Sequence, residues 1–493
     1  MMEGFELSKA VNANNVFLVN HSELEGRLDI DCYRPEINKL EHKVRAKTTK
    51  KLSDFIIKMA SGATPSVQEE VRFYGDIENG IPFLRVQNLN HNGELSLDEV
   101  KFINHETHNN CLKRSQVSEH DLLVKITGVG RMAIASVAPI GFVGNTNQHM
   151  VVIKTKSEEQ SRYLANYLNL DIIEALASRR ATGATRPALD YPALKSIPII
   201  EHIDFSLLKQ AEQQKQQKEQ QAQTLLDGID SYLLNELGIT LPQQDNRLEK
   251  RIFTVPFSEV AGGRIDPKLY DLTTKGIRSA IRTSLFKQKS LKELITHSSA
   301  GDWGDDEFDE LSNDYLKCLV VRATEFDNEY NLKLDNSRVK YRLIHRDRLK
   351  FIDVKANDLL IEKSGGSIDQ PVGRIALVTE EYIAEHQLCY SNFIHKIRVN
   401  QSVASPEYLF YYLKLMHNIK LTEAMQSQTN GIRNLIMSSY FNQMVVLPEF
   451  KRQNEIATHI SQIRAQAMQL QLEAAQVLAT AKAEIEPMIL GQA

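Results

Sequence analysis

The sequence repeats itself once at long range, with residues 17–238 returning in diverged form as residues 253–491. The stretch Phe17–Asp29 (FLVNHSELEGRLD) matches Phe253–Asp266 (FTVPFSEVAGGRID). Further matches follow in the same order, namely Asp121–Val124 with Asp358–Ile361, Gly130–Ala133 with Gly373–Ala376, and Tyr163 and Tyr167 with Tyr408 and Tyr412. A single repeat of this length differs from a solenoid, whose units are about 20–50 residues long. The chain therefore encodes two homologous modules that act in the same way on two sites.

The composition excludes several classes of protein. At 493 residues the chain is long enough for several domains, each with its own core. The four cysteines lack metal-ligand or Cys-x-x-Cys spacing, which favours reduced thiols and a cytoplasmic location. We expect no signal peptide and no membrane contact, because no apolar run approaches the roughly 20 residues of a membrane helix. The net charge of −4 means that any DNA binding must come from local patches.

The first three quarters of each repeat predict a mixed fold of short strands, turns and short helices. In the first copy, β-rich runs bounded by Gly, Asn and Pro are followed by a helix around Tyr163 and by a closing strand. The runs are residues 81–86, 121–126, 133–137 and 150–153, and the closing strand is residues 196–200. We therefore expect an α+β fold with two homologous mixed α/β domains, at residues 15–202 and 250–448.

The last quarter of each repeat predicts one long helix, at residues 203–240 and 449–490. Eight glutamines with interspersed Lys and Glu, and no Gly or Pro, occupy residues 210–223 and favour a solvated helix. Gly238 marks the end of the first helix, and Pro487 with Gly491 marks the end of the second. Both helices carry a heptad seam, which in the first is apolar at both ends and basic in the middle. The seam positions are Leu208, Ala211, Lys215, Lys218, Ala222, Leu225 and Ile229, and Ile456, Ile460, Ile463, Ala467, Leu470, Ala474, Val477 and Ala481.

Heptad seams in general favour association between separate chains. Because two such helices occur in one chain, each after a homologous domain, an antiparallel pair within the chain is the more economical arrangement. A helix of about 34 residues is about 50 Å long, and one turn of B-DNA is about 34–36 Å. Two domains joined to such a pair would meet DNA at two places somewhat more than one turn apart.

This organisation resembles the specificity subunits of type I restriction–modification enzymes, and the resemblance covers nearly the whole chain. In the first copy, residues 61–65 (SGATP), 81–89 and 182–198 look like the family's opening strand segments, closing glycine loop and final strand. In the second copy, residues 430–448 look like the same closing loop and strand. The second copy departs at the SGATP position, where residues 300–310 form an acidic loop to which we assign no DNA role.

The resemblance implies that both domains are target recognition domains, each bound to one half of a bipartite double-stranded DNA target, with the antiparallel helices as a coiled-coil spacer. Methyltransferase (M) and restriction (R) subunits would be the partners. S-adenosylmethionine, ATP and Mg²⁺ would belong to those partners, which leaves this chain without a cofactor of its own. The sequence agrees with a non-catalytic role, because it contains no Asn/Asp-Pro-Pro-Tyr/Phe, phosphate-loop or His-Glu-x-x-His motif.

Two polar, glycine-rich loops at matched places, residues 125–131 and 363–374, are the first candidates for DNA contacts. Loops rich in Arg, Lys, Gln, Ser and Thr supply the groups that base edges and phosphates require. The second loop is longer, which suits two domains with different targets, and simple hairpin drift explains the difference equally well. Arg131 and Arg374 are either phosphate contacts or structural ion pairs. The candidate residues are Lys125, Thr127, Arg131, Lys363, Ser364, Ser367, Gln370 and Arg374.

Two further polar segments complete the candidate interface. The first consists of amide side chains that precede a strand, namely Asn145, Asn147, Gln148 and Asn392. Such amides can pair with adenine, but Asn-rich turns also serve backbone geometry alone. Residues 179–186 form a basic loop, with residues 426–433 as counterpart, that suits phosphates and base edges together. Its candidates are Arg179, Arg180, Thr182, Thr185, Arg186, Gln428, Asn430 and Arg433.

Two alternatives remain open from the sequence. The repeated Gly-Arg-(Leu/Ile)-Asp segment at Gly26 and Gly263 is either structural or a docking site for a partner subunit. The acidic net charge is also compatible with a protein–protein adaptor whose duplicated domains make no DNA contact. A salt titration separates the adaptor from a DNA-binding subunit, because phosphate-mediated binding falls steeply with salt concentration.

Overall fold

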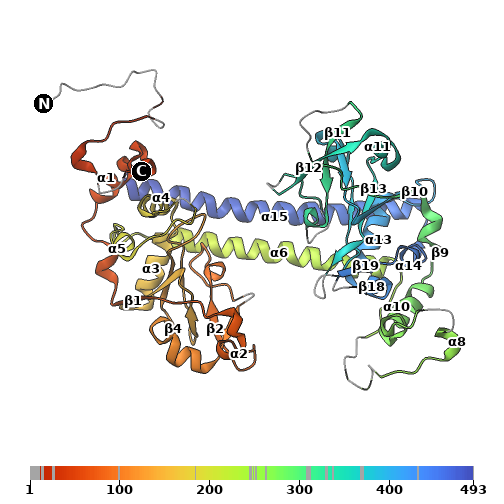
Figure 1. The fold of residues 1–493 in the computed structure, drawn as a ribbon, viewed down its shortest axis with the longest axis horizontal. Coiled ribbons are helices and arrows are strands. Elements are labelled where there is room, and N and C mark those ends of the chain that lie inside the picture. The colour runs from red at the N-terminus through yellow and green to blue at the C-terminus, as the bar shows by residue number, and fades with distance from the viewer. Residues whose placement is uncertain are drawn as a thin grey trace. The chain divides into compact units, whose positions relative to one another are not determined.

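The computed structural model describes residues 12, 16–24, 28–97, 100–183, 185–243, 247, 249, 252–260, 264–306, 313–327, 331–335, 338–366, 371–429 and 432–491. The chain divides into two compact units, one made of residues 1–219 and 471–493 and the other of residues 220–470. Each unit contains one copy of the repeat together with parts of both long helices (Figure 1). In the described part of the chain, no helix combines the length and apolar character needed to cross a membrane.

The first unit is built around two small four-stranded sheets. The first sheet has the strand order β1, β8, β5, β6 with all neighbours antiparallel, and the second has the order β3, β2, β7, β4 with β2 and β7 parallel. The strands are β1 (Lys58–Ser61), β2 (Ile81–Leu84), β3 (Lys101–Ile103), β4 (Gln116–Ser118), β5 (Leu122–Lys125), β6 (Ala135–Val137), β7 (Val143–Thr146) and β8 (Met150–Lys154). The apolar runs of β5, β6 and β8 are almost entirely buried and form the centre of the unit.

The second unit repeats this topology. Its main sheet has the order β10, β17, β13, β15, again antiparallel throughout, and its second sheet has the order β12, β11, β16 with β11 and β16 parallel. These strands are β10 (Ile295–Ala300), β11 (Tyr315–Val321), β12 (Lys340–His345), β13 (Asp358–Glu362), β15 (Ile375–Leu377), β16 (Leu388–Tyr390) and β17 (Ile394–Val399). Two smaller sheets are formed by β14 (Ser364–Gly366), β19 (Ile432–Leu435) and β18 (Gln426–Thr429), and by β20 (Met444–Leu447) and β9 (Lys287–Ser290). The equivalent strand orders confirm the duplication predicted from the sequence.

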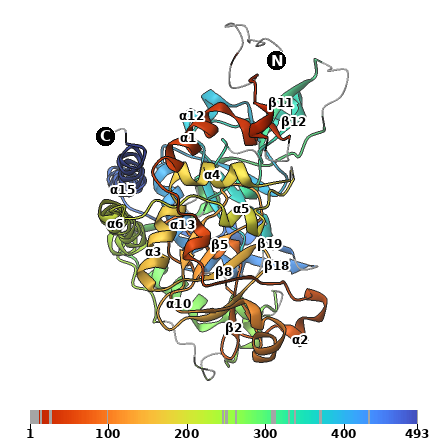
Figure 2. The ribbon, with the colours of Figure 1, turned by 90° about the vertical axis from the view of Figure 1, so that its left-hand side faces the viewer.

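Short helices surround the sheets in both units. In Figures 1 and 2, β2 and the helix α2 (Glu70–Phe73) lie at the end of the first unit away from the helix α4 (Asp171–Arg180). The helices of the first unit are α1 (Pro35–Arg45), α2 (Glu70–Phe73), α3 (Glu158–Leu168), α4 (Asp171–Arg180) and α5 (Tyr191–Lys195). Those of the second are α8 (Phe257–Val260), α9 (Pro267–Tyr270), α10 (Leu272–Arg282), α11 (Arg346–Ile352), α12 (Glu380–Glu385), α13 (Pro406–Asn418) and α14 (Met437–Phe441). The mixed helix and sheet content confirms the predicted α+β class.

The matched tyrosine pairs close each domain in the same way. On α3, the hydroxyl groups of Tyr163 and Tyr167 donate hydrogen bonds to the carbonyls of Ile200 (2.5 Å) and Pro198 (3.0 Å). On α13, Tyr408 and Tyr412 donate to the carbonyls of Val446 (2.6 Å) and Met444 (2.9 Å). These bonds anchor the chain segment that leads from each domain into its long helix.

The closing segments of the two domains differ in their pairing. The second forms β20, which pairs with β9, whereas the strand predicted at residues 196–200 makes only an isolated bridge between Pro198 and Lys51. Proline has no backbone N–H to donate to a neighbouring strand, so a continuous ladder cannot pass through Pro198.

The two long helices, α6 (Ser206–Glu236) and α15 (Phe450–Leu490), pack against each other in both units. In the first unit, Lys218 contacts Glu473 at 2.6 Å, and Leu208 shares a buried core with Ile485. In the second unit, the rings of Tyr232 and His459 lie 4.6 Å apart. Residue numbers rise along α6 as they fall along its partner, so the helices are antiparallel. The predicted antiparallel coiled coil is therefore confirmed.

One detail of the second helix differs from the prediction, because α15 continues through Pro487 as far as Leu490. Proline removes one backbone hydrogen bond from a helix. Ile485 and Ile489 on either side of it are almost fully buried in the core of the first unit, and this burial holds the last turn in place. The helix then ends at Gly491, whose positive φ of 69° suits glycine.

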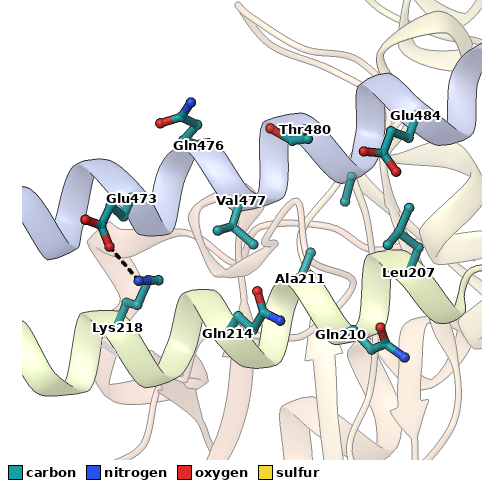
Figure 3. A pocket seen from close by; sticks show the side chains of 11 residues that line it. Leu207, Gln210, Ala211, Gln214, Lys218, Glu473, Gln476, Val477, Thr480 and Glu484 are labelled. Carbon is teal, nitrogen blue, oxygen red and sulfur yellow. Dashed lines mark hydrogen bonds and ion pairs between the residues drawn. The ribbon is translucent and has the colours of Figure 1, made fainter.

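The basic middle of the α6 seam borders a cavity of about 390 Å³ between the helices (Figure 3). Ala211 and Val477 point into the space between the helices, with Gln210 and Gln214 on α6 beside them. Lys218 bounds this cavity and reaches across to Glu473. Small and amide side chains replace large apolar ones here, so the seam is less tightly packed than at its apolar ends.

We expect the Lys218→Met substitution to change the free energy of unfolding by less than about 1 kcal/mol, because exposed ion pairs contribute little. The side chains of Lys218 and Glu473 are 28% and 40% exposed, and methionine retains most of the lysine stem. Urea unfolding of the wild-type and variant chains tests this expectation. A loss of several kcal/mol would mean that the cross-helix ion pair is essential to the coiled coil.

Candidate nucleic-acid interface

Three strand ends of the first unit meet at one edge of its main sheet. Ser61, the last residue of β1, pairs with Val151 of β8, and Lys125, the last of β5, pairs with Met150. The loops that follow β1 and β5 therefore leave the sheet beside the turn that precedes β8. Gly62 makes this convergence possible, because a Cβ atom there would lie 1.6 Å from the Thr146 carbonyl oxygen. The sheet edge thus gathers polar segments that are far apart in the sequence.

A hairpin-like loop adds a fourth segment to this edge. The backbone groups of Thr182 and Ala188 exchange two hydrogen bonds of 2.9 and 2.8 Å, and the Gly128 N–H donates to the Pro187 carbonyl at 3.0 Å. Thr182, Thr185 and Arg186 are exposed on this loop. Three predicted DNA contacts therefore lie at the protein surface, next to the loop that follows β5.

The predicted residues of the other loops occupy different environments. Gln148 is exposed, and its Oε1 accepts a hydrogen bond from the Thr64 hydroxyl. Thr127 is partly exposed. Arg131 is partly exposed, but its guanidinium pairs with Asp171 and donates to the Asn169 carbonyl at 3.1 Å. Of the two interpretations open for Arg131, the structural ion pair is the one observed.

Three other predicted contacts of the first unit are buried and hold the loops rather than face solvent. The Asn145 amide donates to the Leu112 carbonyl at 2.8 Å and contacts the His108 ring, and Asn147 accepts a backbone bond from His149 at 3.1 Å. Lys125 is 4% exposed and donates to the Val129 carbonyl at 2.8 Å. Burial lowers the pKa of Lys125, while the charge of Glu174 opposes this effect. We therefore correct the assignment of Lys125, Asn145 and Asn147 from DNA contacts to positioning residues.

The largest correction concerns Arg179 and Arg180, at the end of α4. Both are more than 90% buried and form ion pairs with Glu41 of α1, at 2.9 Å for Arg179. Arg179 also donates to the Cys32 carbonyl at 2.6 Å, and Arg180 to the Leu176 carbonyl at 2.6 Å. Burial by itself raises the pKa of Glu41, but the hydrogen bond and charge of Arg180, with the charges of Arg179 and Arg45, outweigh it and lower the pKa. The two arginines stabilise the domain and are not available to DNA.

The second unit places the equivalent strand ends at an equivalent edge. Ala300, the last residue of β10, pairs with His395, and Glu362, the last of β13, pairs with Ile394 at the start of β17. Gly301 has the role of Gly62, because a Cβ atom there would lie 2.1 Å from the Tyr390 carbonyl oxygen. The β18–β19 hairpin joins this edge through β14 and through a 2.7 Å hydrogen bond from the Leu435 N–H to the Lys363 carbonyl.

The predicted residues of the second unit again separate into exposed and buried sets. Asn392 and Gln428 are exposed, and Lys363 and Arg433 are partly exposed. Ser364 and Arg374 are 7% exposed, so we correct their assignment as DNA contacts: Ser364 donates to Asn434, and Arg374 forms a two-point ion pair with Glu362 (2.9 and 3.0 Å). Ser367, Gln370 and Asn430 lie outside the described residues.

His395 lies beneath the same edge of the second unit. Burial lowers its pKa to about 4, and the nearby charge of Lys363 adds to the shift. Its Nε2 lies 2.7 Å from the Ser298 hydroxyl. The ring is therefore neutral at physiological pH and adds no positive charge to the edge.

Sequence reasoning missed two residues of these surfaces. Thr64 is exposed and bonds to Gln148, and its place in the SGATP segment was the available signal. Arg264, in the repeated Gly-Arg-Ile-Asp segment, contacts the β18 backbone, and its recurrence in both copies was the corresponding signal. Within the described residues, no group of three or more His, Cys, Asp and Glu side chains is placed to hold a metal ion.

The structure is thus a duplicated α+β architecture, in which each domain has a polar, loop-rich edge and is followed by one helix of an antiparallel pair. The type I restriction modification DNA specificity domain matches residues 46–201 and 283–477, which is most of the chain. The chain belongs to this family.

Several solved structures contain chains to which this chain is similar. One is described as showing complex assembly and conformational transition of the type I restriction–modification system (12% identity, 90% of this chain and 97% of that chain, TM-score 0.43). Another is the S subunit from M. genitalium (12% identity, 90% and 95%, TM-score 0.37), and a third the HsdS subunit from Thermoanaerobacter tengcongensis (12% identity, 90% and 96%, TM-score 0.30). No curated protein sequence matches the chain.

Proposed function

We propose that this chain is the sequence-specificity subunit of a type I restriction–modification complex and that each target recognition domain binds one half of a bipartite double-stranded DNA target. The family match of both domains supports this proposal most strongly. The duplicated sheet edge supports it further, because the first domain presents exposed amide, hydroxyl and arginine side chains there, and the second presents the exposed amides of Asn392 and Gln428 with the partly exposed Arg433. Such side chains are those that recognise base edges and phosphates.

The long helices set the spacing between the two half-sites in this proposal. At about 1.5 Å per residue, the 31 residues of α6 extend about 46 Å, somewhat more than one turn of B-DNA. The number of base pairs between the two half-sites would therefore be fixed by the length of the helices. The identity of those base pairs would not matter.

The chain acts in this proposal without a catalytic centre of its own. It recruits methyltransferase and restriction subunits in the cytoplasm, and S-adenosylmethionine, ATP and Mg²⁺ serve those partners. Its contribution to the reaction is to position the methyltransferase over a target adenine.

A methylation map of host DNA tests the proposal. Hosts that express the neighbouring methyltransferase with and without this chain are compared by sequencing that detects N6-methyladenine. We expect a new motif of two short half-sites around a fixed gap, present only with this chain. If no motif depends on the chain and the purified protein retains no DNA at any salt concentration, the adaptor hypothesis replaces the proposal.

A further inference from the structure

A groove in the second unit runs beside the β18–β19 hairpin and extends beyond the recognition loops. Its walls come from residues 264–268, at the start of α9, and from Glu423, residues 426–428 and Arg433. The polar side chains that line it include Arg264, Lys268, Gln428 and Arg433. Gln428 and Arg433 also belong to the hairpin that joins the candidate interface, so the groove is continuous with that interface.

Arg264 is held rigidly in this groove with part of its guanidinium unused. Its Nη2 donates to Asp266 at 2.6 Å and to the Gln426 carbonyl at 2.6 Å. Its Nη1 is buried and has no hydrogen-bond partner among the described residues. A buried donor without an acceptor is unfavourable, and an anion in the groove would supply an acceptor. Rigid guanidinium groups are especially suited to phosphate oxygens.

The charges in the groove favour an anion. Lys268 is matched by Glu423 at 3.2 Å and by Asp271 at 3.6 Å, and Asp266 is matched by Arg264. Arg433 makes no ion pair within the described part of the chain and lies on the other wall of the groove. The residues that line the groove therefore comprise three cations and two carboxylates, and among the described residues Arg433 is the lining cation without an ion-pair partner.

We infer that Arg264 and Arg433 bind a backbone phosphate of the DNA next to the half-site of the second domain. This inference rests on the proposed function and extends it to a residue outside the recognition loops. A phosphate contact adds affinity without sequence information, so the groove fixes the position of the duplex while the loops recognise bases. In this inference, the Gly-Arg-Ile-Asp segment of the second copy supplies Arg264 for a phosphate contact.

Salt-dependent DNA binding by the full chain, alone and with its methyltransferase subunit, tests the inference. The variants are Arg433→Gln and Arg264→Gln, singly and together, and the control is Lys289→Gln, an exposed lysine on β9 in a separate sheet. Removal of one phosphate contact lowers the slope of log K against log salt by about 0.9. We expect that decrease for Arg433→Gln, with equal losses of affinity for target and non-target duplexes and no change for the control.

The possible outcomes separate the two levels of the proposal. If the wild-type chain binds DNA but the Arg433→Gln and Arg264→Gln slopes equal the wild-type slope, the groove assignment is wrong and the proposed function stands. A variant that loses discrimination between target and non-target DNA at an unchanged slope shows a base contact and also overturns the phosphate assignment. If the wild-type chain binds no DNA in either form, both proposals fail. Arg433 has no ion pair to lose among the described residues, so its variant remains informative even if Arg264→Gln fails to fold.

Discussion

The Glu41→Ala substitution will destabilise the first unit by about 3–5 kcal/mol, the usual cost of breaking a buried ion pair by removing one partner. Glu41 is 6% exposed and pairs with both Arg179 and Arg180. Its loss deprives two buried guanidinium charges of a shared counterion. Urea unfolding of the variant should show the transition of the first unit at lower urea concentration, while the transition of the second unit stays in place.

A matched control is Glu69→Ala, which removes the carboxylate of the exposed pair between Arg72 and Glu69 in the same unit. We expect a change below about 1 kcal/mol for this exposed pair. Equal effects of the two substitutions would show that the buried cluster contributes no more than a surface pair.

The same cluster predicts a dependence of stability on pH. The pKa of Glu41 in the folded state is lower than its ordinary value of 4.5. The stabilisation is therefore complete above pH 4.5 and is lost as the pH falls through the folded-state value, because protonation removes the charge that the arginines require. The Glu41→Gln variant should lack this part of the acid dependence, and identical acid profiles for variant and wild type would contradict the assignment.

The second large effect is expected at the exposed edge of the first domain. Removal of one base contact costs about 1–3 kcal/mol, so the triple variant Gln148→Ala, Thr185→Ala and Arg186→Ala should weaken binding of the target duplex about 100-fold or more. Binding of non-target DNA should fall much less, because contacts to bases are absent from non-specific complexes. Quantitative titration of both duplexes measures this difference, and a melting curve checks the fold.

Arg162→Ala is the control for this experiment, since Arg162 is exposed on α3 of the same unit and pairs with Glu158. We expect no loss of discrimination for this variant. If the triple variant and the control bind the target equally well, the edge built by β1, β5 and β8 is not the recognition surface. Substitution of Arg179 or Arg180 cannot replace this test, because their loss would damage the fold itself.

The candidate site was predictable in part from local sequence. Glycine, hydroxyl and amide residues between strand-like runs indicated where loops leave the sheets, and the exposed residues Gln148, Thr182, Thr185, Arg186 and Asn392 lie on those loops. The exposed Gln428 lies instead on strand β18 of a hairpin. Local sequence could not distinguish them from Arg179 and Arg180 in the same basic segment. The deciding partner, Glu41, is 138 residues away from Arg179.

The sequence by itself determined the duplication, the α+β class and the two long helices, because each depends on repetition or on periodicity over many residues. The heptad seam from Ile456 to Ala481 requires only that apolar positions recur at helical spacing. Tertiary structure alone decided which polar side chains face solvent. Burial of an arginine, or the lack of a partner for the Arg264 Nη1 among the described residues, depends on groups that approach from distant parts of the chain, and these groups leave no signal in the local sequence.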